Sequence, residues 1–122
     1  MATSSPSHTF AGHVETVRDA RDFVREQLLG TKVDVDCAVL LTSELASNAV
    51  VHAQSDYRIT IRRNHGSIRI ELLNDAPGAL PVLRAPSEGG RGLGLVDAMS
   101  SRWGTESESD HKLVWFELPD PA

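Results

Sequence analysis

Residues 57–72 alternate apolar and polar side chains on both sides of a short turn, and this pattern constrains the fold most strongly. An apolar side chain occupies every second position in residues 57–61, and after Asn64-His65-Gly66 the alternation resumes in residues 68–72. The apolar positions are Tyr57, Ile59, Ile61, Ile68, Ile70 and Leu72. A period of two predicts a β-hairpin with one buried face. The core should therefore lie between two layers of secondary structure.

The chain before this hairpin divides into a tail and a helix. Residues 1–7 are small and polar and should form a flexible tail, so a single domain is expected from residue 8 to residue 122. A short extended piece is expected around residues 8–10. In residues 14–29 apolar side chains recur at steps of three and four, which predicts an amphipathic helix ended by Gly30.

A second helix is expected from about Asp34 to Ala53. Asp34 or Asp36 can cap its N-terminus and interact favourably with the helix dipole. Between Cys37 and Ala53 the only formally charged side chain is Glu44. Neighbouring elements should therefore bury most of this helix.

The chain after the hairpin contains loops, a short helix and a second hairpin. Residues 74–86 are rich in Pro, Gly and Ala, and residues 87–94 are rich in glycine and lead into a helix beginning near Leu93. Trp103 and residues 113–118 should form the closing hairpin. This order of helices and antiparallel strands indicates an α+β fold.

The composition argues against several classes of function. A formal net charge of -5 and a pI near 5.4 give no overall attraction for nucleic acid phosphates. The single cysteine, Cys37, allows neither an internal disulfide nor a zinc site built from thiolates, which is typical of a reducing compartment. No stretch approaches the roughly 18 apolar residues of a membrane span. We therefore expect a cytoplasmic protein without a membrane anchor.

Glu44, Asn48 and His52 follow one another at intervals of four residues. On a helix this spacing places them within an arc of roughly 80°. A carboxylate and a carboxamide on a largely apolar helix need polar partners. Oxygen ligands of this kind suit magnesium, which takes one or two protein oxygens together with water and phosphate. A helix-helix hydrogen-bond network explains the same spacing, and His52 has a structural explanation as well.

The glycine-rich segment 89–94 leads directly into a helix. Free backbone N–H groups and the helix dipole favour a phosphate there, glycine allows a close approach, and Arg91 could add positive charge. A plain flexible connector is the alternative explanation. The segment is not a P-loop, because no Gly-Lys-Ser/Thr follows, and its late position does not fit a Rossmann fingerprint.

Taken together, residues 41–53 and 90–98 resemble the N box and the second glycine box of the gyrase, chaperone, histidine kinase and MutL ATPase superfamily. The turn at residues 101–104, the end of the chain at residues 114–118 and the short length are similar to the actinobacterial anti-sigma-factor serine kinases. The resemblance covers nearly the whole chain. It implies a two-layer α/β sandwich with a mostly antiparallel mixed sheet, with ATP held between helices and sheet under a mobile loop.

The resemblance also implies roles for individual residues. Glu44 corresponds to the general base that deprotonates a hydroxyl, and Asn48 to the magnesium ligand that bridges the ATP phosphates. The residues implied to bind the nucleotide are Asn48, His52, Asn74, Asp75, Ala76, Gly78, Arg91, Gly92, Leu93, Gly94 and Leu95. Among these, Gly92 and Gly94 would line the phosphates.

Two positions depart from the family pattern at the adenine end. Continuing the strand alternation places Asn74, and not Asp75, where relatives carry the aspartate that receives the adenine amine. An amide accepts a weaker hydrogen bond than a carboxylate. Asp75 could substitute only through a change of register. Relatives also commonly carry a threonine after the lysine of the last strand, where this chain has Leu113 after Lys112.

The resemblance implies an ATP- and magnesium-dependent serine protein kinase that acts on a small anti-anti-sigma (STAS-type) protein and sequesters a sigma factor. The alternative is a non-catalytic, kinase-like binding module with weak or lost nucleotide binding, and Asn74 and Leu113 favour it. An unrelated α+β domain is a third explanation. No direct contact with nucleic acid or membrane is expected. The oligomeric state stays open, with a homodimer as one option.

Overall fold

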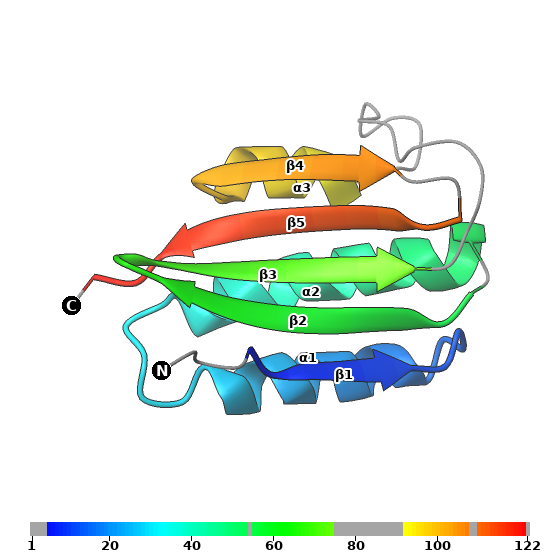
Figure 1. Ribbon diagram of the computed structural model, residues 1–122. Helices are drawn as coiled ribbons and strands as arrows, with labels where there is room; N and C mark the ends of the chain where they lie inside the picture. The colour runs from blue at the N-terminus through cyan, green and yellow to red at the C-terminus, as the bar shows by residue number, and fades with distance from the viewer. Residues whose placement is uncertain (1–4, 54, 75–91, 108–109, 122) are drawn as a thin grey trace.

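Five strands form one sheet, and the helices cover one of its faces (Figure 1). The computed structural model describes residues 5–53, 55–74, 92–107 and 110–121. In chain order the elements are β1 (Ser7–Phe10), α1 (Thr16–Gln27), α2 (Val35–Asn48), η1 (Ala49–Ala53), β2 (Tyr57–Asn64), β3 (Ser67–Asn74), α3 (Gly92–Met99), β4 (Arg102–Ser107) and β5 (Lys112–Pro119).

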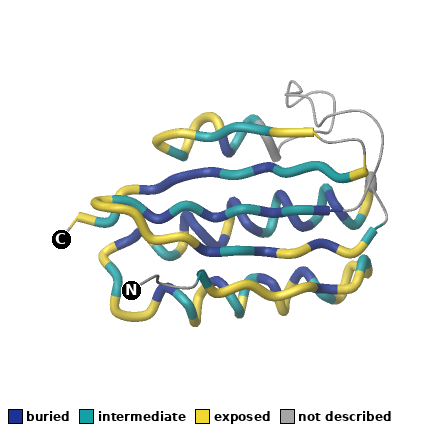
Figure 2. The backbone as a smooth tube through the Cα atoms, in the orientation of Figure 1, coloured by how far each residue is buried: buried dark blue, intermediate teal, exposed yellow. Residues whose placement is uncertain are grey.

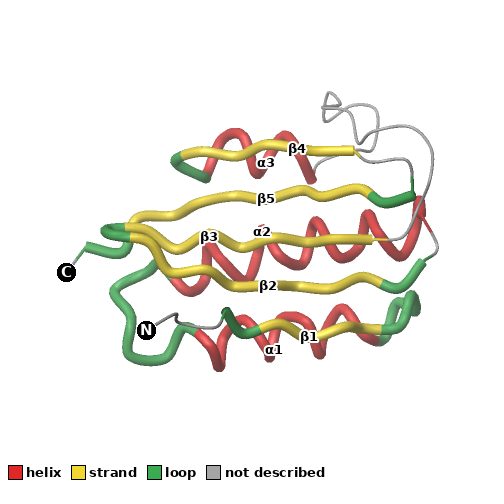
Figure 3. The backbone as a smooth tube through the Cα atoms, viewed as in Figure 1, coloured by secondary structure: helices red, strands yellow, loops and turns green. Residues whose placement is uncertain are grey.

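The strands lie in the order β1-β2-β3-β5-β4, and each described pair of neighbours is antiparallel. The expected α+β class and the two-layer sandwich are confirmed. A mostly antiparallel mixed sheet was expected, and the described pairs include no parallel one. Helices α1, α2 and α3 all lie behind the sheet in the view of Figure 3, so no helix of the described residues covers the opposite face of the sheet.

Hairpin β2–β3 has the register that the alternation predicts. Asn64 pairs with Ser67 across the turn, and Gly66 has a positive φ of 77°, which glycine adopts at little cost. In β3 every second residue is buried, from Ile68 to Asn74. The buried residues of the sheet and those of the helices form one hydrophobic core. Figure 2 shows buried segments, in dark blue, in both layers.

Strand β1 begins slightly earlier than the sequence indicates. Its first residue is Ser7, and the carbonyl of Pro6 already accepts a hydrogen bond from the N–H of Ile61 at 2.9 Å. The ring of Phe10 stacks on Tyr57 at 5.4 Å between centroids and meets Phe23 of α1 edge to face at 6.0 Å. These contacts attach β1 to both layers, so the ordered domain includes residues from the expected tail.

Helix α1 has the predicted apolar face but is shorter than expected. It begins at Thr16, and its buried residues Val17, Ala20 and Val24 recur at steps of three and four. After the helix, Gly30 has a φ of 82°, as expected for the glycine that ends it. The opposite face of α1 carries charged side chains.

Helix α2 is capped as predicted and ends differently. The carboxylate of Asp34 accepts a hydrogen bond from the N–H of Cys37 at 3.1 Å. A continuous α-helix to Ala53 was expected, but the α-helix ends at Asn48 and the next five residues form the π-helix η1. The π-helical turn is wider than the α-helical one. It occurs mostly as a single turn within an α-helix, frequently at a functional site. The sequence carries no glycine or proline to mark this change.

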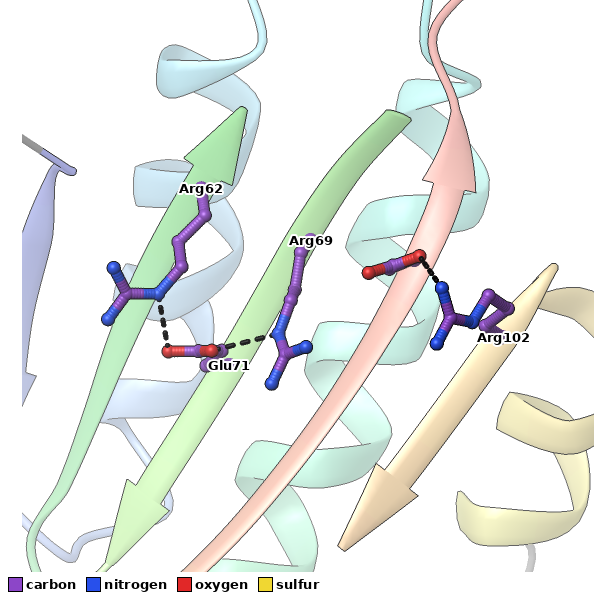
Figure 4. A network of polar contacts seen from close by, with 5 residues as sticks. Arg62, Arg69, Glu71 and Arg102 are labelled. Carbon is purple, nitrogen blue, oxygen red and sulfur yellow. Dashed lines mark hydrogen bonds and ion pairs between the residues drawn. The ribbon is translucent and has the colours of Figure 1, made fainter. Parts of the chain in front are cut away.

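The uncovered face of the sheet is held together by charged side chains (Figure 4). Arg62 and Arg69 lie directly opposite each other on β2 and β3, a like-charge pair that destabilises a sheet unless it is compensated. Glu71 accepts from Nε of Arg62 at 3.0 Å and from Nε of Arg69 at 2.9 Å. The guanidinium of Arg69 also lies 4.0 Å from the ring centroid of Trp115.

No described helix combines the length and the apolar character that crossing a membrane requires.

Candidate functional site

Helices α2 and α3 lie side by side and run in opposite directions (Figure 1). Near the start of α2, Sγ of Cys37 lies 3.8 Å from the carbonyl oxygen of Met99 at the end of α3. Glu44 is seven residues after Cys37 on α2, and Gly92 is seven residues before Met99 on α3. At a rise of roughly 1.5 Å per residue, both lie roughly 10 Å along the helices from the contact between Cys37 and Met99. Glu44 therefore lies level with the N-terminus of α3.

Asn48 shares the side of α2 on which Cys37 and Glu44 lie. At about 100° per residue, the three positions fall within an arc of roughly 40°. Because Cys37 contacts α3, this arc is the α3-facing side of α2. Glu44 and Asn48 are both partly buried there. Neither side chain forms a hydrogen bond or ion pair with another described residue, so the helix-helix network considered above is not seen in the described part of the chain.

The contact between the Cys37 thiol and the Met99 carbonyl is uncharged. Burial raises the pKa of the Cys37 thiol above its ordinary value of 9.0, and the negative charge of Asp34 adds to the rise. The thiol therefore stays protonated near neutral pH and can donate to the Met99 carbonyl. The two helices are joined at this end by a weak hydrogen bond and by packing.

Asn74 is the last residue of β3 and is 5% exposed. It lies on the buried side with Leu72, as the alternation predicts, and its Nδ2 donates to Oγ of Ser55 at 3.5 Å, the long end of the hydrogen-bond range. Its cross-strand neighbours are Tyr57 and Lys112. The end of β3, the end of α2 and the start of α3 lie at the same end of the sandwich (Figure 1).

Leu113 does not lie on the side of the sheet that faces the helices. In β5 the buried core residues are Val114, Phe116 and Leu118, so Leu113 points to the opposite, uncovered face, where it pairs with Leu73. The effect of this position on adenine binding stays a prediction. Lys112, the neighbour of Asn74, is the residue of β5 on the helix side at this end.

The remaining predicted residues are described to different extents. Asp75, Ala76, Gly78 and Arg91 lie outside the described residues. Gly92 and Leu93 lie in the first turn of α3, and His52 lies in η1. Only the backbone of these three residues is described. Gly94 and Leu95 are half-buried, and Leu95 packs against the core.

The contact between α3 and β4 that fixes α3 was not predicted from the sequence. The indole N–H of Trp103 on β4 donates to Oδ1 of Asp97 on α3 at 2.8 Å. The ring of Trp103 also packs against the core. A tryptophan six residues after an aspartate is not a recognisable motif, so only the turn between α3 and β4 brings them together.

The site thus combines three groups of complementary chemistry: the Glu44 carboxylate, the Asn48 carboxamide and the N-terminus of a helix that begins with glycine. A carboxylate can accept a proton, an amide oxygen can bind a hard cation, and free N–H groups at a helix N-terminus can bind an anion. Among the described residues, no three His, Cys, Asp or Glu side chains gather as a metal cluster. Magnesium commonly needs fewer protein ligands than that.

A comparison with known sequences finds a related protein. The chain is 30% identical over 82 residues to the uncharacterized protein SCO4941 of Streptomyces coelicolor, a match that covers 62% of this chain and 78% of the relative. The chain belongs to the family of this Streptomyces protein. No model of a known protein family matches the chain.

Solved structures show where else this fold occurs. The catalytic domain of the histidine kinase ThkA, in a nucleotide-free form, matches with a TM-score of 0.60 and 16% identity over 95% of this chain and 98% of that domain. A second nucleotide-free form gives 0.59 and 15%, covering 98% and 97%. The Acinetobacter baumannii histidine kinase AdeS gives 0.58 and 10%, covering 98% and 70%. The chain therefore has the fold of histidine kinase catalytic domains.

Proposed function

We propose that the protein is an ATP-binding regulator that acts as a serine protein kinase of the anti-sigma-factor type. The observation that carries the proposal is the position of Glu44 and Asn48 on the α3-facing side of α2, level with the N-terminus of α3. The fold shared with histidine kinase catalytic domains supports the nucleotide part of the proposal. The resemblance of residues 41–53 and 90–98 to the family boxes supports the kinase part.

The residues fit ATP and magnesium on chemical grounds. Asn48 offers an amide oxygen to the cation, and the first turn of α3 offers the N–H groups of a helix N-terminus to phosphate oxygens. Asn74 is buried at the end of β3 with a long hydrogen bond to Ser55, so its amide is available to the amino edge of adenine. Mg-ATP would supply the phosphoryl group that is transferred to a serine hydroxyl.

Glu44 would contribute the protein's own chemistry. Its carboxylate would accept the proton of the serine hydroxyl as the oxygen attacks phosphorus, and ADP would leave. The carboxylate has no hydrogen-bond donor among the described residues that would compete for it. The substrate would be a small STAS-type anti-anti-sigma protein, and the same surface of the regulator would sequester a sigma factor when that substrate is absent.

Nucleotide binding is tested first by calorimetry with ATP and ADP, with and without magnesium. We expect binding that Asn48→Ala reduces at least tenfold. Ser47→Ala is the matched control, because Ser47 lies on the same helix but is rotated by about 100° from Asn48. ATP binding that Asn48→Ala leaves unchanged would contradict the assignment.

Phosphotransfer is tested with a STAS-type protein encoded near the gene, by mass spectrometry for phosphoserine. Glu44→Gln should bind ATP like the wild type and transfer phosphate at least a hundredfold more slowly. Bound ATP without any transfer in the wild type would favour the second candidate, a non-catalytic binding module. The specific observation behind that candidate is Asn74, whose amide gives adenine a weaker acceptor than a carboxylate.

A further inference from the structure

A shallow groove runs along the outer surface between α1 and α2. It has a volume of about 430 Å³ and is lined by Arg18, Arg21, Asp22 and Arg25 from α1 and by Asp36, Val39, Leu40 and Ser43 from α2. The arginines follow one another at steps of three and four residues, so they form a row along one side of α1. Three arginines and two aspartates line the groove, so its lining carries a net positive charge on a protein whose net charge is -5.

Most of this positive charge has no partner in the described structure. Arg25 forms an ion pair with Asp22 at 3.7 Å, and both side chains are more than half exposed. Arg18 and Arg21 form no ion pair or hydrogen bond with another described residue. Asp36 is the carboxylate that α2 contributes to the groove. The end of the groove near Arg18 is therefore the more positive end.

Arg18 also occupies an unfavourable position for stability. It is the third residue of α1, where the partial positive charge of the helix N-terminus repels a cation. Asp19 in the same turn offsets part of this repulsion, but Arg18 forms no ion pair with a described carboxylate. A cation kept at this end of a helix without a described ion-pair partner is a candidate for a functional role.

Leu40 adds an apolar contact to this charged surface. Leu40 lies in the middle of α2 and is 40% exposed. Its exposed surface does not contribute the free energy that burying a leucine provides. Val39 beside it is buried and forms part of the groove wall. The groove therefore presents a row of arginines with spacing of three to four residues next to an exposed leucine.

We propose that this groove binds an acidic amphipathic helix of a partner protein. Carboxylates spaced at three to four residues on such a helix would pair with Arg18 and Arg21, and an apolar residue between them would cover Leu40. The Debye length is about 8 Å at physiological salt, so the row of arginines, and not the net charge of the whole protein, sets the local potential.

The groove is separate from the proposed nucleotide site. It lies on the side of α2 that faces α1, whereas Glu44 and Asn48 lie on the side that faces α3. The proposal therefore holds or fails independently of ATP binding. Calorimetry with ATP on every variant below makes the two outcomes distinguishable, because the variants should bind ATP like the wild type.

The probe is a synthetic helical peptide of about 18 residues, with glutamates at steps of three and four and leucines between them. Binding is followed by fluorescence anisotropy and by two-dimensional NMR of the labelled protein. We expect chemical shift changes confined to α1 and α2, and binding weakened at least tenfold between 0.05 and 0.5 M salt. No binding at millimolar peptide, or shift changes centred elsewhere, would overturn the proposal.

Three charge reversals provide the decisive comparison. Arg18→Glu and Arg21→Glu should each weaken peptide binding at least tenfold. Arg58→Glu makes the same change in net charge on the uncovered face of the sheet and should weaken it less than twofold. Equal effects at all three positions would show a nonspecific charge effect and overturn the proposal.

The stability of the same variants separates function from folding. Arg18→Glu should melt at the same or a higher temperature than the wild type, because a glutamate at this position interacts favourably with the helix dipole. A well-folded variant that loses the peptide cannot be explained by unfolding. A second copy of the chain is the other candidate occupant of the groove, and sedimentation velocity tests it. Self-association of the wild type that Arg18→Glu abolishes would assign the groove to a second copy and overturn the proposal.

Discussion

Trp103 and Asp97 are joined by a 2.8 Å hydrogen bond that ties the middle of α3 to β4. Asp97 lies three residues after Gly94, within the helix whose first turn forms one wall of the candidate site. The bond therefore fixes the direction in which the N-terminus of α3 points, together with the contact between Cys37 and Met99 at the other end of the helix.

Removing this bond should loosen α3. We expect Asp97→Ala to lower the free energy of unfolding by about 1 kcal/mol, the typical contribution of one hydrogen bond. Urea unfolding followed by circular dichroism measures the change. Asp22→Ala is the control, since its exposed pair with Arg25 should contribute less than about 0.5 kcal/mol. Equal losses in the two variants would contradict the role assigned to Asp97.

Glu71 should stabilise the uncovered face of the sheet by separating two arginines. In Glu71→Gln, Arg62 and Arg69 would face each other across β2 and β3 without a carboxylate, and we expect a loss of about 1 kcal/mol. Because the repulsion is electrostatic, 1 M salt should reduce the loss. Unfolding at low and high salt tests this, with Glu106→Gln on exposed β4 as control. A loss that is independent of salt would show that packing, not charge, dominates.

Gly104 leaves room for the ring of Trp115. A Cβ at this position would lie 2.7 Å from the ring, closer than real contacts allow. Gly104→Ala should therefore displace Trp115 from beneath Arg69 and destabilise the protein by about 1–3 kcal/mol. Trp115→Val should cancel most of this loss in the double variant, because the clash disappears. Additive losses in the double-mutant cycle would contradict the steric explanation.

Tyr57 should make stability fall at alkaline pH. Burial raises the pKa of its hydroxyl above 10.0, the hydrogen bond to Thr16 lowers it, and the charge of Asp19 raises it further. The folded state therefore holds this proton more tightly than the unfolded state. The stabilisation is fully present below about pH 10 and is lost as pH rises through the raised pKa, with a slope of at most about 1.4 kcal/mol per pH unit.

Tyr57→Phe tests this expectation by removing the titrating group. Its stability should fall less steeply between pH 9 and 11, at a cost of about 1 kcal/mol at neutral pH from the lost bond to Thr16. Both proteins should carry Cys37→Ala, because the pKa of that thiol is raised as well. Parallel alkaline slopes in the two proteins would show that another group is responsible.

The features that the sequence predicted correctly depend on neighbours along the chain. Asp34 caps α2 because its side chain reaches a backbone N–H three residues away. Asn74 is buried because it continues the alternation of β3. Glu44 and Asn48 share a side of α2 because of helical periodicity alone. That this side faces α3 needed the contact between Cys37 and Met99, which are 62 residues apart.

The features that were missed depend on how elements pack. Arg18 and Arg21 appear in the sequence as the solvated face of an amphipathic helix, and only the antiparallel neighbour α2 turns that face into one wall of a groove. The face of the sheet on which Leu113 lies did not follow from its position after Lys112, and the alternation of β5 places it on the uncovered face. The π-helix after Asn48 has no local marker in the apolar sequence that forms it.

The order of the strands has a consequence for cooperativity. β4 is an edge strand, and α3 leads into it through two residues only, so the two elements form one unit at the flank of the sandwich. Such a unit can detach while β2, β3 and β5 stay paired, and its amide hydrogens should exchange faster than those of the central hairpin. Because the first turn of α3 belongs to this unit, any ligand held there would slow that exchange by favouring the closed state.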